Sequence, residues 1–170
     1  MDRGDYYPWQ AAERKRLVQQ READKMPHAL LLSGARHLGK RDFALCMAGY
    51  LLCGTPVAGD PCGTCANCHL VAAGTHPDLR LIEPEGSKLI KIEQIRELTD
   101  WVNQTAQRGG FKVALIHPAE QMNLNAANAL LKSLEEPSAG TVIILVSDLP
   151  GRLPPTIRSR CQHVAFAVPS

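Results

Sequence analysis

A glycine-rich segment in the first third of the chain has the spacing of a phosphate-binding loop. The residues from Gly34 to Arg41 fit the pattern G-x-x-x-x-G-K, in which backbone N–H groups and a lysine contact phosphate oxygens. An ATPase of this type needs Ser or Thr directly after the lysine, because that hydroxyl coordinates the magnesium ion. Here Arg41 follows the lysine, and arginine offers only N–H donors and a fixed positive charge. We therefore expect Gly34, Gly39 and Lys40 to form a vestigial phosphate loop.

The strand that should carry the magnesium-binding acid also lacks it. In P-loop ATPases a later aliphatic strand ends in acidic residues that hold the metal and orient the attacking water. The matching segment, 112–116, runs into His117 and Pro118, whereas magnesium prefers oxygen ligands. Glu120 is acidic, but it lies beyond the strand end, and we interpret it as a solvated helix residue. The sequence therefore predicts that the chain does not hydrolyse ATP at its own site.

Four cysteines lie after the helix that should follow the loop, with the spacing C-x8-C-x2-C-x2-C. They are Cys53, Cys62, Cys65 and Cys68. Thiolates separated by two residues in a tight turn can both reach one tetrahedral zinc ion, and four sulfur ligands leave no open position for a substrate. We expect a structural zinc site, with free cysteines or disulfides as the alternative. His69 and His76 could replace a sulfur, but four cysteines suffice.

Alternating strands and helices should position these groups. Aliphatic segments predict five strands, at 29–33, 78–83, 112–117, 141–146 and 163–168. The helical spacing of apolar residues predicts helices at 40–52, 92–107 and 126–136. This alternation indicates an α/β fold with an open parallel sheet and helices on both of its faces. We expect one domain over residues 1–170, with a zinc-binding insertion at about 53–77.

The composition limits the class of protein. The 170 residues are 45% hydrophobic and 21% charged, which is typical of a soluble globular domain. A net charge of +2 gives no global argument for binding nucleic acid or a membrane. The longest aliphatic run, 142–146, is too short to cross a bilayer, and residues 1–6 do not have the pattern of a signal peptide. Four of the six cysteines have the spacing of metal ligands, which is typical of a reducing compartment, so these features predict a cytoplasmic protein.

Two arginines precede the last predicted strand, in the segment Ile157-Arg158-Ser159-Arg160-Cys161. A guanidinium held at a domain edge can enter the active site of a neighbouring subunit and stabilise charge on a transferring phosphoryl group. From their spacing alone, Arg158 and Arg160 are more simply interpreted as surface or salt-bridge residues.

Taken together, these motifs resemble the clamp-loader subunits of bacterial DNA polymerase III. The resemblance rests on the degenerate loop, the cysteine array, the stretch Asn128–Pro137 and the tripeptide Ser159-Arg160-Cys161, and it covers essentially the whole chain. It is greatest to the delta prime family, in which the nucleotide motifs are degenerate. The gamma and tau motor subunits keep the P-loop threonine and the acidic strand end that this chain lacks. The resemblance implies a P-loop AAA+ core within a five-subunit ring.

The resemblance also implies roles for particular residues. Arg160 would be an arginine finger that reaches the ATP of an adjacent motor subunit, and the four cysteines would carry zinc. The polar sensor residue would be Ser147 or Asp148. The implied partners are the gamma/tau motor subunits and the delta subunit, with the sliding clamp and primed DNA engaged through the complex. Family members continue into a helical lid and a collar, so we expect this chain to be the N-terminal AAA+ domain alone.

Two other functions stay open. The first is an active P-loop ATPase of the gamma/tau type, in which Asp42 or Glu120 replaces the missing magnesium ligands. The second is a zinc-stabilised DNA-binding module, for which the basic run 14–16 could contact phosphates. The insertion itself argues against DNA contact, because it has no Lys or Arg from residue 53 to residue 79.

Overall fold

Five parallel strands form one sheet at the centre of the chain. The computed structural model describes residues 7–167. The strands are β1 (Ala29–Ser33), β2 (Leu79–Ile82), β3 (Lys112–Ile116), β4 (Thr141–Ser147) and β5 (Gln162–Ala165). Their order across the sheet is β2-β3-β4-β1-β5, and each neighbouring pair is parallel. All five carboxyl ends therefore lie along one edge of the sheet, here called the carboxyl edge, and the amino ends lie along the opposite, amino edge.

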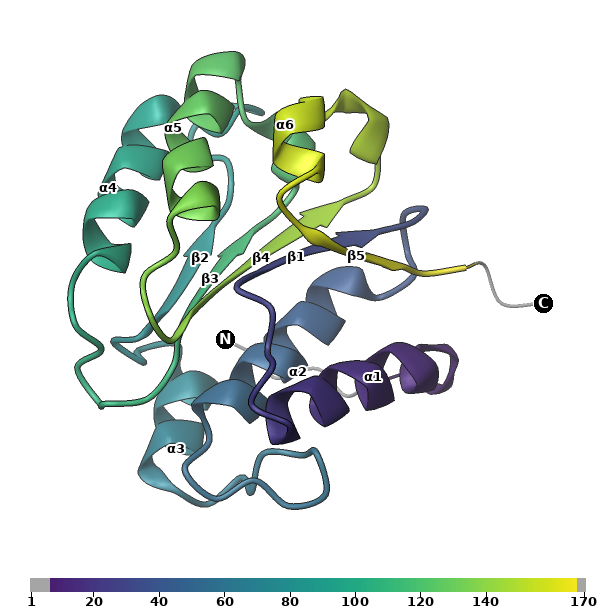
Figure 1. Cartoon of the computed structure of the whole chain (residues 1–170), viewed down its shortest axis with the longest axis vertical. Helices are drawn as coiled ribbons and strands as arrows, with labels where there is room; N and C mark the ends of the chain where they lie inside the picture. The colour runs from purple at the N-terminus through teal and green to yellow at the C-terminus, as the bar shows by residue number, and fades with distance from the viewer. Residues whose placement is uncertain (1–6, 168–170) are drawn as a thin grey trace.

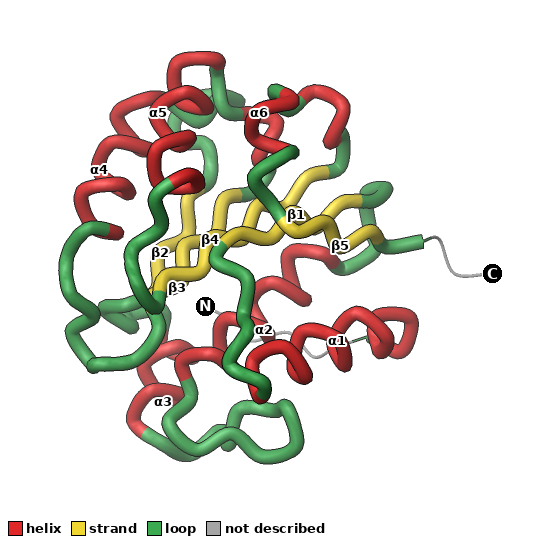
Figure 2. The backbone as a smooth tube through the Cα atoms, in the orientation of Figure 1, coloured by secondary structure: helices red, strands yellow, loops and turns green. Residues whose placement is uncertain are grey.

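Helices cover both faces of this sheet, as Figures 1 and 2 show. One face carries α1 (Ala11–Glu22) and α2 (Lys40–Leu52), and α3 (Ala66–Ala73) follows α2. The other face carries α4 (Ile92–Val102), α5 (Leu124–Glu135) and the short α6 (Pro155–Arg158). Single 3-10 turns are η1 (Pro8–Gln10), η2 (Ala119–Gln121) and η3 (Pro150–Arg152). Among the described residues, no helix is both long and apolar enough to cross a membrane. The predicted α/β architecture is confirmed.

The core consists of two apolar layers, one on each face of the sheet. Successive side chains of a strand point to opposite faces, so Leu30 and Leu32 of β1 pack with Phe43 of α2. Leu31, between them, packs in the other layer with Leu130 of α5. All five side chains are fully buried. Burial on both faces explains why the strands appear in the sequence as continuous aliphatic runs.

The strand bounds differ slightly from the predicted ones. The strand predicted at 78–83 spans 79–82, and the buried carboxylate of Asp78, just before it, accepts the backbone N–H groups of Gln107 and Arg108. The strand predicted at 112–117 ends at Ile116, close to Pro118, which has no N–H to continue a ladder. The strand predicted at 141–146 runs one residue further. The strand predicted at 163–168 spans 162–165, and residues 168–170, like residues 1–6 of the signal-peptide interpretation, lie outside the described residues.

Two helices were predicted with wrong ends. The helix predicted at 92–107 stops at Val102, since the chain turns there and the Lys112 ammonium donates to the carbonyls of Trp101 and Gln104. The helix predicted at 126–136 begins two residues earlier, because the Asn123 side chain accepts the N–H of Ala126 and so caps the helix. The helices α1 and α3 and the short α6 were not predicted.

Candidate functional site

The glycine loop joins β1 to α2 at the carboxyl edge of the sheet. Gly39 precedes the first helical residue, Lys40, and has a φ of 74°, in the left-handed region. A side chain at this position would be strained, and its Cβ would lie 2.5 Å from the Tyr7 ring, so the site requires glycine. At the start of the loop, a Cβ atom added at Gly34 would lie 2.7 Å from the carbonyl oxygen of Phe166. The strand–loop–helix geometry of a P-loop is therefore present.

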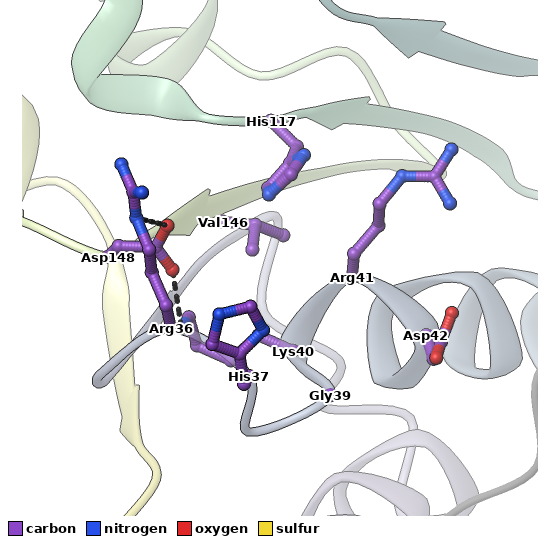
Figure 3. Close-up of a pocket in the computed structure, with 9 residues that line it drawn as sticks. All are labelled: Arg36, His37, Gly39, Lys40, Arg41, Asp42, His117, Val146 and Asp148. Atoms are coloured by element: carbon purple, nitrogen blue, oxygen red, sulfur yellow. Dashed lines mark hydrogen bonds and ion pairs between the residues drawn. The ribbon is translucent and has the colours of Figure 1, made fainter.

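Lys40, the P-loop lysine, is bound by oxygens of its own chain. Its Nζ lies 2.8 Å from the carbonyl oxygen of Gly34, 2.6 Å from that of Ala35 and 2.7 Å from Oδ1 of Asp148. The Lys40 side chain is only 3% exposed. Figure 3 shows Asp148 between Lys40 and Arg36, whose Nε lies 3.5 Å from the second carboxylate oxygen. A carboxylate of the chain thus contacts the lysine that contacts phosphate in an ATPase.

A pocket with a volume of about 340 Å³ lies beside the loop, lined in part by Arg36, Lys40, Asp42, His117 and Asp148 (Figure 3). Arg41, at the position of the metal-binding hydroxyl, also lines it, and its Nη2 lies 3.3 Å from Oε1 of Glu83. His117 Nδ1 lies 3.5 Å from the other oxygen of the same carboxylate. At the two positions where an ATPase holds magnesium, this pocket therefore carries nitrogen side chains.

Glu120 is not the solvated helix residue that the sequence predicted. Its Oε2 accepts the backbone N–H groups of Asp148 and Leu149, each at 3.1 Å, because η2 folds back against the end of β4. The two candidate sensor positions differ as well. Ser147 is fully buried, and its Oγ accepts the N–H of Leu149, whereas Asp148 lines the pocket. Asp42, the other candidate metal ligand, accepts the hydroxyl of Tyr7 at 3.3 Å.

The segment Tyr7–Gln10, here called the strap, lies against the loop. Trp9 Nε1 donates to the carbonyl oxygen of Leu38, and Gln10 Nε2 donates to the carbonyl oxygens of Leu38 and Gly39, all at 3.0 Å. The rings of Tyr7 and Trp9 stack with centroids 4.7 Å apart. Sequence reasoning missed this contact, because no periodic pattern connects residues that are 28 or 29 positions apart.

The four predicted cysteines come together, with all their Sγ atoms within 4.8 Å of one another. Cys53 and Cys65 are 3.9 Å apart at sulfur, as are Cys62 and Cys68. A tetrahedron of sulfurs around a metal at about 2.3 Å has edges of about 3.8 Å, so these residues fit a tetrahedral ion. His76 lies outside the cluster.

The surroundings of the cysteines favour thiolates on one side of the cluster. The N–H of Cys62 donates to the sulfur of Cys53, and the N–H of Cys65 donates to that of Cys62, each at 3.2 Å. Hydrogen bonds from Thr55 and Thr64 lower the pKa of Cys62 to about 5. Burial raises the pKa of Cys68 to about 12. Cysteine binds a metal ion as a thiolate, so binding an ion would displace a proton from the sulfur of Cys68.

Arg160 lies at the edge of the sheet opposite to the loop. It lies two residues before Gln162, the first residue of β5, which pairs with Leu30 near the start of β1, whereas the loop begins after Ser33 at the end of β1. The two sites are separated by the length of a five-residue strand, about 16 Å at 3.3 Å per residue. The Arg160 side chain is 52% exposed, and its Nη2 lies 3.5 Å from a carboxylate oxygen of Glu135. An exposed pair of this kind contributes about 0–1 kcal/mol, so Arg160 can leave it at little cost.

Comparison with known proteins assigns the family. The sequence model of the family described as "DNA polymerase III, delta subunit" matches residues 9–170. The chain belongs to this family. The chain is 52% identical over 166 residues to DNA polymerase III subunit delta' of Pseudomonas aeruginosa, a match that covers 97% of this chain and 50% of the relative. It is 39% identical over 165 residues to the delta' subunit of Escherichia coli, over 96% of this chain and 49% of the relative. The predicted resemblance to the delta prime family is confirmed.

This member of the delta family is also similar to subunit tau of DNA polymerase III. It is 40% identical over 137 residues to subunit tau of Escherichia coli, over 81% of this chain and 21% of the relative. The chain spans about half the length of the delta' relatives that it matches.

Solved structures agree with the predicted AAA+ core. A DNA polymerase III gamma subunit-related protein from Thermotoga maritima superposes with a TM-score of 0.67 at 29% identity, over 90% of this chain and 46% of that one. The RuvB Holliday junction branch migration motor of the same organism gives 0.53 at 16% identity, over 92% of this chain and 43% of that one. The second likeness concerns the fold alone.

Proposed function

We propose that this chain is the AAA+ core of a DNA polymerase III clamp-loader subunit that does not hydrolyse ATP and donates Arg160 to a neighbouring motor subunit. The observation that carries the proposal is the environment of Lys40. In a motor this lysine binds the β- and γ-phosphates, and here its ammonium contacts Asp148 and two backbone carbonyls. A pocket closed in this way is consistent with a subunit that contributes to catalysis only through a different part of its surface.

The two positions that hold magnesium in an ATPase carry no oxygen ligand in this chain. Arg41 replaces the magnesium-binding hydroxyl, and His117 replaces the acid at the end of β3. Both side chains lie near Glu83, whose carboxylate they share. Without magnesium, the charge that develops on the transferred phosphoryl group is not neutralised, and without an acid the attacking water is not oriented.

The active-ATPase alternative is weakened, because both of its candidate magnesium ligands already have hydrogen-bond partners in the chain. Glu120 is engaged by two backbone N–H groups, and Asp42 is paired with the hydroxyl of Tyr7. The DNA-binding alternative is also weakened, since Arg14 pairs with Asp60 at 2.7 Å and Arg16 donates to the carbonyl of His163. These two arginines of the basic run thus connect α1 to the insertion and to β5.

Arg160 has the properties that a finger in trans requires. It is exposed, it is held by one weak ion pair, and it lies at the amino edge, away from the pocket of its own chain. Head-to-tail rings bring one surface of each subunit against a different surface of the next, so an arginine at one edge meets a neighbour's opposite edge. There a guanidinium would stabilise the charge on the γ-phosphate, an effect worth about three to five decades in rate.

The cysteine cluster fits zinc, which we propose as its resident metal. Zinc accepts four thiolates in a closed tetrahedral site, and such sites stabilise structure without taking part in catalysis. Its residues, Cys53, Cys62, Cys65 and Cys68, would hold the insertion, which includes α3, in one conformation. The proposed partners are the gamma/tau motor subunits and the delta subunit, with the sliding clamp and primed DNA engaged through the complex. The proposed compartment is the cytoplasm, with no membrane partner.

The finger is tested by Arg160→Ala in the complete subunit, reconstituted with its motor subunits on primed DNA. We expect intact assembly and a loss of about three to five decades in ATP turnover at the one site that Arg160 serves. Single-site turnover has to be followed, because the other sites keep their own fingers. Arg152→Ala is the matched control, since Arg152 is also exposed but lies in η3 at the carboxyl edge. Equal turnover in both variants would overturn the proposed role of Arg160.

A further inference from the structure

We infer that Asp148 acts as a built-in substitute for a phosphate group: its carboxylate binds Lys40 and thereby closes the loop to nucleoside di- and triphosphates. The inference rests on the proposed function, since it explains how a P-loop stays formed in a subunit that does not hydrolyse ATP. It goes further in naming the residue that excludes the ligand, and in predicting that removing one negative charge reopens the site.

The ammonium group of Lys40 has no N–H donor left for a phosphate. An ammonium group has three N–H donors, and three oxygens of the chain lie within 2.6–2.8 Å of Lys40 Nζ. The Lys40 side chain is almost completely buried, so its ammonium cannot gain further partners by moving into solvent. A phosphate oxygen could bind only by displacing one of these acceptors. Asp148 is the only one of the three that carries a charge.

Hydrogen bonds to the backbone also hold Asp148 in place. Glu120 accepts the N–H groups of Asp148 and Leu149, and the hydroxyl of Ser147 also accepts the N–H of Leu149. These bonds fix the turn after β4. Figure 3 shows the Asp148 side chain directed toward Lys40 and Arg36. Glu120 is therefore a positioning residue for the contact between Asp148 and Lys40.

A phosphate that enters the pocket would also meet carboxylates that already pair with the positive side chains there. The second oxygen of Asp148 lies 3.5 Å from Arg36, so one carboxylate serves two cations of the pocket. Glu83 pairs with Arg41, and its second carboxylate oxygen lies 3.5 Å from Nδ1 of His117. An entering phosphate would compete with both carboxylates for these cations, and each displaced carboxylate would then lie beside a like charge.

Groups of the chain itself contact both ends of the loop. The strap donates three hydrogen bonds to the carbonyls of Leu38 and Gly39, on the part of the loop that leads into α2. Lys40 binds the carbonyls of Gly34 and Ala35 at the other end. Contacts within the chain thus fix both ends of the loop.

The test is the affinity of the chain for fluorescently labelled ADP, with and without magnesium. Asp148→Asn keeps the size of the side chain and removes its charge, and we expect it to bind ADP at least tenfold more tightly than the unaltered chain. The double variant Lys40→Met, Asp148→Asn should lose this gain, because the released lysine is what binds the phosphate. Asp100→Asn, at an exposed position of α4, is the matched control and should not change the affinity.

Two results would overturn the inference: equal affinity for ADP in the unaltered chain and Asp148→Asn, or a gain that persists when Lys40 is also replaced. If Asp148→Asn does not fold, hydrogen exchange of residues 34–40 in the unaltered chain decides the question. We expect protection that saturating ADP does not change, whereas added protection would contradict the inference. The outcome is separate from that of the proposed function. A chain that binds ADP without hydrolysing ATP would refute only the role of Asp148, and an unaffected Arg160→Ala complex would refute only the finger.

Discussion

Two positive charges on this chain have opposite environments. Lys40 is 3% exposed and contacts three oxygens, whereas Arg160 is 52% exposed and faces one exposed carboxylate at 3.5 Å. Breaking a buried ion pair by removing one partner typically costs about 3–5 kcal/mol, and an exposed pair contributes about 0–1 kcal/mol. Lys40 is therefore committed to its own chain, and Arg160 is available to another.

Replacing one cysteine of the cluster tests whether the four sulfurs bind zinc. Cys62→Ser removes one of the four thiolates, and a serine hydroxyl does not replace a thiolate as a zinc ligand. We expect about one zinc ion per unaltered chain by elemental analysis and a loss of that zinc in the variant. Cys46→Ala is the control, because Cys46 is buried in α2 and is not part of the cluster. Equal zinc content in the two variants would contradict the assignment.

His76 makes the stability of the chain depend on pH. Its Nδ1 accepts the N–H of Asp78, and its Nε2 lies 2.9 Å from the side-chain oxygen of Asn67 in α3. Burial lowers the pKa of His76 below its ordinary value of 6.5. As the pH falls below 6.5, the unfolded chain takes up a proton that the folded chain resists, so the free energy of unfolding decreases.

The contribution of His76 can be isolated by urea unfolding at pH values above and below 6.5. His76→Gln should reduce the difference between the two conditions, because the variant has no imidazole to protonate in the unfolded state. His69→Gln, at an exposed position near the same cluster, should retain the full difference. Loss of the pH dependence in both variants would mean that His76 is not its source.

Among the elements, α5 shows how one polar residue sets a helix end. Asn123 accepts the N–H of Ala126 at 2.8 Å, and the helix therefore begins at Leu124. Asn123→Ala should cost about 1 kcal/mol in urea unfolding without changing the denaturant slope. Asn125→Ala changes the same residue type at an exposed position inside the helix, and we expect a smaller effect. Equal costs would show that the cap is not what stabilises the start of α5.

The elements that could be predicted from the sequence are those with a strong local pattern. The strand at 29–33 and the helix at 40–52 have the predicted bounds, since a buried parallel strand and an apolar helix each leave a clear signal. The helix α1 was missed because only Leu17 is buried in it, so no apolar stripe marks it. The helix α3 was missed because it is an eight-residue element within the cysteine segment.

The same distinction applies to the candidate sites. The cysteine cluster was predictable, because three of its ligands lie within seven residues and their spacing itself indicates a metal. The contact of Lys40 with Asp148 was not, because 108 positions separate the two residues and only the parallel pairing of β1 with β4 brings them together. The engagement of Glu120 likewise depends on how η2 folds against the end of β4.

At the scale of the whole molecule, the parallel sheet places the phosphate-loop pocket and Arg160 at opposite ends of its strands. The pocket lies at the carboxyl edge, and Arg160 lies at the amino edge, so the first can be closed without disturbing the second. The proposed function uses this separation. A subunit with a closed pocket and an exposed arginine would add no ATP site of its own to a ring, but it would complete the site of one neighbour.

The most direct test of this account compares both edges in one experiment. Lys40→Met and Arg160→Ala are each introduced into the complete subunit, assembled with the motor subunits, and ATP hydrolysis at the adjoining motor site is measured on primed DNA. The account predicts unchanged turnover for Lys40→Met and a loss of about three to five decades for Arg160→Ala. The reverse pattern, with turnover that depends on Lys40 and not on Arg160, would contradict the account and identify this chain as a motor.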